Sequence, residues 1–145
     1  MSSSRRNIDI LNKMIQYCDE VGEANDHFGN SLEMLKTNST YKNVVVMCIL
    51  QIGELTKHLS DDFRAAYTGM PWQDIKSMRN IAAHRYGDFR IEMLWDTVTD
   101  DIPALREYCE GIIRQYEVIA QDCNEEINCE YEEPEEEQGH SMKLE

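Results

Sequence analysis

The sequence predicts an all-α protein: an antiparallel bundle of four to five helices, followed by an acidic tail. Seven glycines and three prolines in 145 residues are too few for a turn-rich β architecture. Several stretches repeat apolar residues at the i, i+3, i+4, i+7 spacing of an amphipathic helix. After residue 123, nine acidic residues stand against one lysine, a composition typical of disordered chain. We therefore expect one helical domain over residues 1–122 and a disordered tail over residues 123–145.

The first predicted helix covers about residues 5–22, and a polar break with two glycines follows it. Its apolar positions recur at helical spacing, at Ile8, Leu11, Ile15 and Cys18. A short helix is expected near residues 31–35. These two elements make up the N-terminal part of the bundle.

The third predicted helix covers about residues 39–59. Its segment 44–50 is apolar on nearly every side, which also fits a buried strand. The helical period continues through Ile52, Leu55 and Leu59, and this favours a helix. A helix that is apolar all round must be covered all round, by neighbouring helices or by a second subunit.

Two further helices are expected after a connector at residues 60–71. The fourth runs from about residue 72 to residue 83, with Pro71 at its entrance and Gly87 beyond its end. The fifth runs from about residue 91 to residue 119. It contains Pro103, which should kink it or split it in two.

Charge and hydropathy limit the classes of function. The net charge of −14 disfavours general binding of nucleic acid, which depends mainly on neutralising phosphates. The segment 76–90 is locally basic, with four basic residues against Asp88, and its candidate phosphate contacts are Lys76, Arg85 and Arg90. The chain has neither an apolar run of roughly 20 residues that could span a membrane nor the apolar segment of a secretory signal. We expect a cytoplasmic protein with no membrane partner.

The cysteines indicate neither a metal site nor a disulfide framework. There are five of them, without CxxC spacing and without a cluster of His and Cys, so we expect no metal and no cofactor. Cys18 and Cys48 fall in apolar helical patterns and are predicted to be core residues. Cys123 and Cys129 could form a bridge, but a reducing cytosol favours the free thiols.

The most informative stretch is residues 79–86, which places Arg79, Asn80, His84 and Tyr86 at the end of the fourth helix. Asn80 and His84 are four residues apart and share a helix face. Arg79 and His84 are separated by about 140° around a continuous helix. They converge only if the helix ends before His84, or if two copies of the chain each supply one arginine and one histidine.

These side chains suit cleavage of RNA without a metal. An imidazole can transfer protons near neutral pH, and the C-terminal end of a helix favours its cationic form. A guanidinium can stabilise the charge that builds up on phosphorus. Each residue also has a plainer interpretation: His84 as a helix cap, Arg79 as a surface ion-pair partner and Tyr86 as a packing residue.

The same residues resemble a known family. Arg79-Asn80-x-x-x-His84-x-Tyr86 is similar to the RNxxxHxY motif of HepT-like toxins, a branch of the HEPN superfamily. The resemblance extends over about residues 5–118. Its other elements are the IGE triplet at 52–54, the PWxxI element at 71–75 and the MRN element at 78–80.

This resemblance implies an all-α HEPN fold and a homodimer whose active cleft lies between the subunits. It implies a metal-independent endoribonuclease that acts on RNA as the toxin of a type II/VII-like toxin–antitoxin pair. The implied partner is an MNT-type nucleotidyltransferase antitoxin, which silences the toxin by transferring AMP to Tyr86. Arg79 and His84 would be the catalytic pair, and Asn80 a supporting residue. Arg85 is a variable position that could add a phosphate contact or face water.

Several alternatives stay open at the level of sequence. Glu54 could hold Arg79 or Asn80 in place, or it could be an exposed helix residue. The acidic tail could mimic nucleic acid in the basic cleft, contact the antitoxin, or simply be solvated. The chain could also be a non-catalytic helical subunit that binds a nucleotidyltransferase and serves as its substrate, or a plain dimeric scaffold, since a fold does not fix an activity.

Overall fold

The computed structural model describes the backbone of residues 3–84 and 90–144, and the side chains of residues 4–79 and 90–124. Within these ranges the regular elements are helical and no strand occurs, so the all-α prediction is confirmed. In chain order the elements are α1 (Ser3–His27), α2 (Leu32–Thr37), α3 (Ser39–Lys57), α4 (Asp61–Ala66), α5 (Trp72–His84), α6 (Ile91–Asp96), the π-helical segment η2 (Thr97–Asp101) and α7 (Ile102–Leu144).

The chain divides into two compact units, Met1–Glu110 and Gly111–Glu145. The first contains the helices up to the first turns of α7, and the second is the continuation of α7. The predicted boundary at residue 122 therefore falls inside the second unit. Disorder of residues 123–145 stays a prediction. Among the described residues, no helix combines the length and apolar character needed to cross a bilayer.

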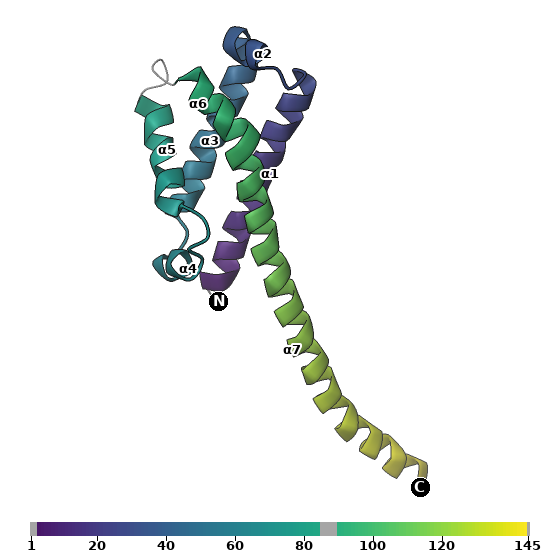
Figure 1. Ribbon diagram of the computed structural model, residues 1–145. Helices are drawn as coiled ribbons and strands as arrows, with labels where there is room; N and C mark the ends of the chain where they lie inside the picture. The colour runs from purple at the N-terminus through teal and green to yellow at the C-terminus, as the bar shows by residue number, and fades with distance from the viewer. Residues whose placement is uncertain (1–2, 85–89, 145) are drawn as a thin grey trace. The chain divides into compact units, whose positions relative to one another are not determined.

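Helix α3 is the central element of the first unit, because it packs against α1 and also against α5 (Figure 1). Helix α2 contacts both α3 and α6. Leu11, Cys18 and Ile52 are buried in the core, as the helical spacing predicts, whereas Ile8, Ile15 and Leu55 are only half-buried. Fully buried members include Leu11, Met14, Val21, Leu35, Val45, Ile49 and Leu94.

The apolar surface of α3 is not completely covered within one chain. Val45, Ile49 and Ile52 are buried, as expected. On another side of the helix, Val44 and Met47 keep 37% and 55% of their surface exposed. Neighbouring helices of the same chain therefore cover only part of this helix.

The predicted fifth helix is interrupted, as Pro103 suggests, but the interruption begins before the proline. Helix α6 ends at Asp96, and the chain then forms the π-helical segment η2 before α7 begins at Ile102. The N–H of Ile102 donates to the carbonyl of Thr97, five residues earlier. Pro103 has no N–H to donate and its ring crowds the preceding turn, so a wider turn just before it accommodates the proline.

Candidate active site

Helix α5 carries the predicted site residues, and aromatic packing fixes its N-terminal end. The Trp72 side chain is only 5% exposed and lies near the rings of Phe63 and Tyr108. Its indole N–H donates to the carbonyl oxygen of Tyr67 over 2.6 Å. Pro71 immediately precedes the helix, where its fixed φ angle suits a helix entrance. The start of α5 is therefore held by burial and by a hydrogen bond.

Gly53 allows α5 to approach α3 closely beside Arg79. A Cβ atom added at Gly53 would lie 2.6 Å from the Arg79 Cβ and 3.1 Å from both the Arg79 backbone nitrogen and the Ile75 carbonyl oxygen. A Cβ atom essentially never lies within 3.0 Å of a non-bonded atom, so any larger residue would push the helices apart. The middle residue of the IGE triplet is thus required by packing, a role that the sequence alone did not reveal.

The next residue, Glu54, pairs with Arg79. Arg79 Nε lies 3.0 Å from Glu54 Oε2, and the side chains are 40% and 34% exposed, respectively. The two facing atoms are themselves shielded from solvent, although the N–H is not aligned for a hydrogen bond. We therefore describe the contact as an ion pair. Of the two alternatives for Glu54, contact with Arg79 is the one observed.

His58 is a further ionisable group beside this pair, and sequence reasoning overlooked it. Its Nε2 lies 4.0 Å from Oε1 of Glu54, one helical turn away on α3. The Glu54 carboxylate therefore faces Arg79 with one oxygen and His58 with the other. The i, i+4 spacing of Glu54 and His58 was the signal available in the sequence.

Helix α5 extends without interruption through His84, its last residue. The alternative in which the helix ends before His84 is therefore wrong. On a continuous helix, Arg79 and His84 differ by about 140° in direction and about 7.5 Å along the axis. The side chains of Asn80 and His84 lie outside the described residues, as do Arg85 and Tyr86 entirely.

The remaining candidate phosphate contacts lie in different places. Lys76 precedes Arg79 by one turn of α5 and lines a surface groove together with Arg64 and Asp61. Arg90 is exposed and directly precedes α6. Neither the groove nor the start of α6 includes Arg79, so the described residues do not unite these cations into one site.

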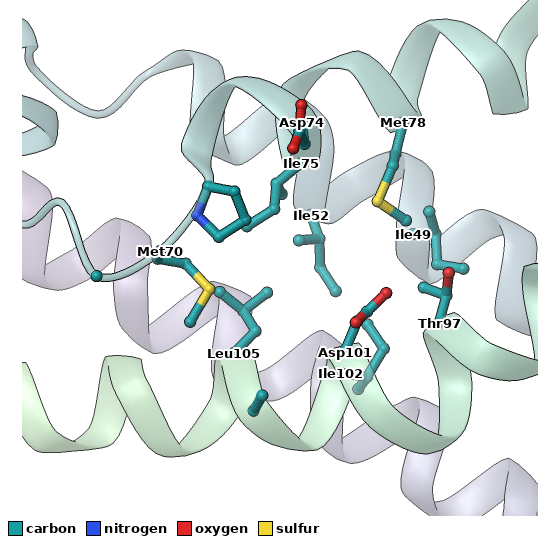
Figure 2. A pocket seen from close by; sticks show the side chains of 13 residues that line it. Ile49, Ile52, Met70, Asp74, Ile75, Met78, Thr97, Asp101, Ile102 and Leu105 are labelled. Carbon is teal, nitrogen blue, oxygen red and sulfur yellow. The ribbon is translucent and has the colours of Figure 1, made fainter.

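A cavity of about 460 Å³ lies beside this region, on the side where α5 and α3 face η2 and the start of α7 (Figure 2). Ile75 and Met78 contribute to it from α5, and Ile52 from α3. Asp74 and Asp101 are its acidic lining residues. It adjoins the contact of Gly53 with Arg79, because Ile52 and Met78 are the sequence neighbours of those two residues.

Within the described residues, no group of three or more His, Cys, Asp and Glu side chains is placed to hold a metal ion. Cys18, Cys48 and Cys109 are buried free thiols, which confirms that the first two are core residues, and Cys123 is an exposed free thiol. Burial is the largest cause that raises the pKa of each buried thiol to about 12. Such thiols are protonated at neutral pH and are not suited to act as nucleophiles.

Known proteins similar to this chain are named as ribonucleases. "Putative RNase MJ1216" of Methanocaldococcus jannaschii is 28% identical over 108 residues, which cover 74% of this chain and 88% of that protein. "Putative RNase MJ1380" of the same organism is 29% identical over 73 residues, covering 50% of this chain and 67% of that protein. "Probable ribonuclease HepT" of Thermococcus cleftensis is 34% identical over 62 residues, 43% of this chain and 56% of that protein.

No solved structure matches the chain significantly. The family model described as "Ribonuclease HepT-like" matches residues 14–112. The match covers well over half of the chain and includes α3, α5, Gly53, Glu54 and Arg79. The chain therefore belongs to the HepT-like ribonuclease family.

Proposed function

We propose that the chain is a metal-independent endoribonuclease in which Arg79 and His84 are the catalytic pair. The observation that carries the proposal is the placement of Arg79 on α5, fixed by the close contact at Gly53 and by the Glu54 carboxylate. The same helix ends at His84. Side chains held by packing and by a second residue are the ones that can meet the geometry that catalysis requires.

The proposed reaction needs one proton acceptor and one proton donor. A His84 imidazole takes the proton of the ribose 2′-hydroxyl, and the 2′-oxygen attacks the adjacent phosphorus. The bond to the 5′-oxygen breaks, and that oxygen leaves with a proton from the His84 imidazolium formed when the imidazole took up the 2′-hydroxyl proton. The products are a 2′,3′-cyclic phosphate and a 5′-hydroxyl. Arg79 stabilises the negative charge on the phosphoryl oxygens, and Asn80, on the same face as His84, is assigned a supporting role.

The active form in this proposal is a homodimer. Two observations support it: the continuous α5 separates Arg79 from His84 in direction, and α3 leaves Val44 and Met47 exposed. A second copy can supply the missing partner residue and cover the remaining apolar surface. Arg85 and Arg90 are the further cations that we assign to phosphate contacts at the edge of this cleft.

We further propose that the enzyme is a cytoplasmic toxin, silenced when a nucleotidyltransferase antitoxin of the MNT type transfers AMP to Tyr86. Tyr86 is two residues beyond His84. An AMP group there would add a negative phosphodiester and a large base beside the imidazole. It would repel and obstruct an RNA phosphate. Intact mass spectrometry after co-expression of the two proteins should show one or more AMP units mapped to Tyr86, and an unshifted mass would contradict this part.

The test of the catalytic part is cleavage of RNA by the purified, unmodified dimer in EDTA. We expect cleavage by the wild-type chain and none by His84→Ala or Arg79→Ala, with the circular dichroism of both variants unchanged. Growth arrest on expression should require the same two residues. Intact RNA after long incubation with folded, unmodified wild-type dimer would contradict the proposal.

One observation favours a second candidate, a non-catalytic subunit that binds the nucleotidyltransferase and serves as its substrate. Glu54 already compensates the charge of Arg79, which weakens attraction for phosphate. In that case Tyr86 would still be modified, but RNA would stay intact and His84→Ala would behave as wild type. The EDTA assay and the mass measurement together separate the two candidates.

A further inference from the structure

The cavity between α5 and the start of α7 has an apolar floor. Seven of the residues that line it carry large aliphatic or thioether side chains: Ile49, Ile52, Met70, Ile75, Met78, Ile102 and Leu105. Four of these, Ile49, Ile52, Ile102 and Leu105, are buried core residues. At about 460 Å³, the cavity falls in the size range of clefts that bind small organic molecules.

The mouth of the cavity is acidic. Asp74 and Asp101 are exposed residues that also line the cavity, and Figure 2 shows the Asp101 carboxylate directed into it. Thr97 is the hydroxyl-bearing residue of the lining, and its hydroxyl donates to the carbonyl of Met93. No lysine, arginine or histidine is among the described residues that line this cavity.

The negative charge at this mouth is reinforced by its surroundings. Burial raises the pKa of Asp101, and the nearby carboxylates of Asp100 and Asp96 raise it further, while a hydrogen bond with Thr97 lowers it. Three carboxylates thus lie close together on α6 and η2. A cation placed among them would relieve their mutual repulsion.

We propose that this cavity binds a small amphipathic cation, with an apolar body on the floor and one protonated amine at the Asp101 carboxylate. The two halves of the site match the two halves of such a ligand. An RNA segment or a fatty acid would bring negative charge to an acidic mouth. A neutral apolar molecule would leave the carboxylates without a counter-charge. This assignment does not depend on the proposed ribonuclease activity.

A molecule bound in this cavity would contact the sequence neighbours of Gly53 and Arg79. Ile52 directly precedes Gly53, and Met78 directly precedes Arg79. A ligand on the floor would therefore touch both helices beside the contact of Gly53 with Arg79. The site is distinct from the ion pair, because Glu54 and Arg79 do not line the cavity.

The test uses the full chain and three probes that share one apolar body: 4-phenylbutylamine, 4-phenylbutan-1-ol and 4-phenylbutyrate. Binding is followed by NMR of methyl-labelled isoleucine and methionine. We expect the amine to shift the methyl signals of Ile52, Ile75 and Met78, while Met47, on the exposed side of α3, stays unchanged. The amine should bind roughly ten times more tightly than the alcohol, and the carboxylate more weakly than both, because a hydrogen bond between charged groups is stronger than one to a neutral hydroxyl.

Asp101→Asn supplies the decisive comparison. This variant should bind the amine about tenfold more weakly than the wild type does, so that the amine and the alcohol bind about equally well. Its affinity for the alcohol should not change. Asp62→Asn, the same change at an exposed position of α4, should leave all three affinities as in the wild type. Equal binding of the three probes would overturn the proposal, as would full affinity of the amine for Asp101→Asn. Methyl shifts that follow protein concentration and ignore the probes would show that a second copy fills the cavity instead.

Discussion

Helix α5 has two sides that are held in different ways. Toward α3, the helices approach so closely that an added methyl group at Gly53 would collide with Arg79, and the Glu54 carboxylate pairs with the same arginine. Toward η2 and the start of α7, Ile75 and Met78 border a cavity of about 460 Å³ (Figure 2). One side is therefore tightly packed and electrostatically paired, and the other is open and acidic.

The difference shows how one helix can serve two purposes. Packing at the closed side fixes the backbone of Arg79, which a catalytic guanidinium requires. Space at the open side costs packing energy, because the lining atoms lose contacts that a filled core would give them. A protein that keeps such a space gains room for a ligand.

The largest effect is expected from Gly53→Ala. The added Cβ has no space beside Arg79, so α3 and α5 must separate, which should cost about 1–3 kcal/mol of unfolding free energy. RNA cleavage should fall with the displacement of Arg79. Urea unfolding and cleavage assays measure the two effects.

Gly22→Ala is the matched control, because Gly22 lies within α1 and a Cβ there meets no atom within 4 Å. Alanine at this position should leave cleavage unchanged and raise stability by up to about 1 kcal/mol, because it restricts the unfolded chain and favours the helix. If the two glycine variants unfold at the same urea concentration, the close contact at Gly53 carries no energetic weight.

Glu54→Gln should separate catalysis from stability. A partly exposed ion pair contributes at most about 1 kcal/mol, so the unfolding midpoint should change little. Arg79 would lose its charged partner and its fixed position, and single-turnover cleavage should fall roughly tenfold or more. Asp19→Asn removes an equivalent carboxylate from the pair with Arg106 on α7, and it should leave cleavage intact. Equal cleavage by both variants would show that Glu54 does not position Arg79.

On the open side, Asp101→Asn should raise stability at neutral pH. The folded chain holds the proton of Asp101 more tightly than the unfolded chain, because its pKa is raised in the fold. Ionised Asp101 therefore destabilises the fold above this raised pKa, and the penalty disappears below the ordinary aspartate pKa. The carboxylate is largely solvated, so the gain should not exceed about 0.5 kcal/mol. The unfolding free energies of wild type and variant should converge as the pH falls through this window. A difference in unfolding free energy that grows as the pH falls would contradict a raised pKa of Asp101 in the folded chain.

Cysteine reactivity reports on the tight packing of the core. A pKa raised from 9.0 to about 12 by burial leaves Cys18, Cys48 and Cys109 with roughly a thousandfold less thiolate than an ordinary thiol. Iodoacetamide at pH 8 should modify exposed Cys123 first, as peptide mapping would show. Rapid modification of the three buried thiols in native protein would mean that the core opens readily.

The sequence predicted the helices well because their signal is local. The spacing of apolar residues located α3 and α5 to within two residues, whereas α1 extends five residues beyond its predicted end, and Pro103 indicated the interruption near η2. The exact position of this interruption could not be predicted from Pro103, because the widened turn that accommodates the proline is formed by the residues before it. The predicted fifth helix therefore appears as α6, η2 and α7.

The candidate site was only half visible in the sequence. Arg79 and His84 follow from their chemistry and from the motif, and contact with Glu54 was one of two alternatives. The steric role of Gly53 and the proximity of His58 depend on which helix lies opposite, and the cavity depends on how three elements pack. Such features arise from tertiary contacts between distant residues, which a single sequence does not display.

The central claim is that a site placed by α5 is completed by two copies of the chain. Mixing Arg79→Ala with His84→Ala tests it most directly, because a mixed dimer has one intact Arg79 and one intact His84 on different subunits. After subunit exchange in EDTA, RNA cleavage should return, whereas each variant alone should stay inactive. If mixed dimers form, as shown by native mass spectrometry, and RNA remains intact, the shared site is contradicted.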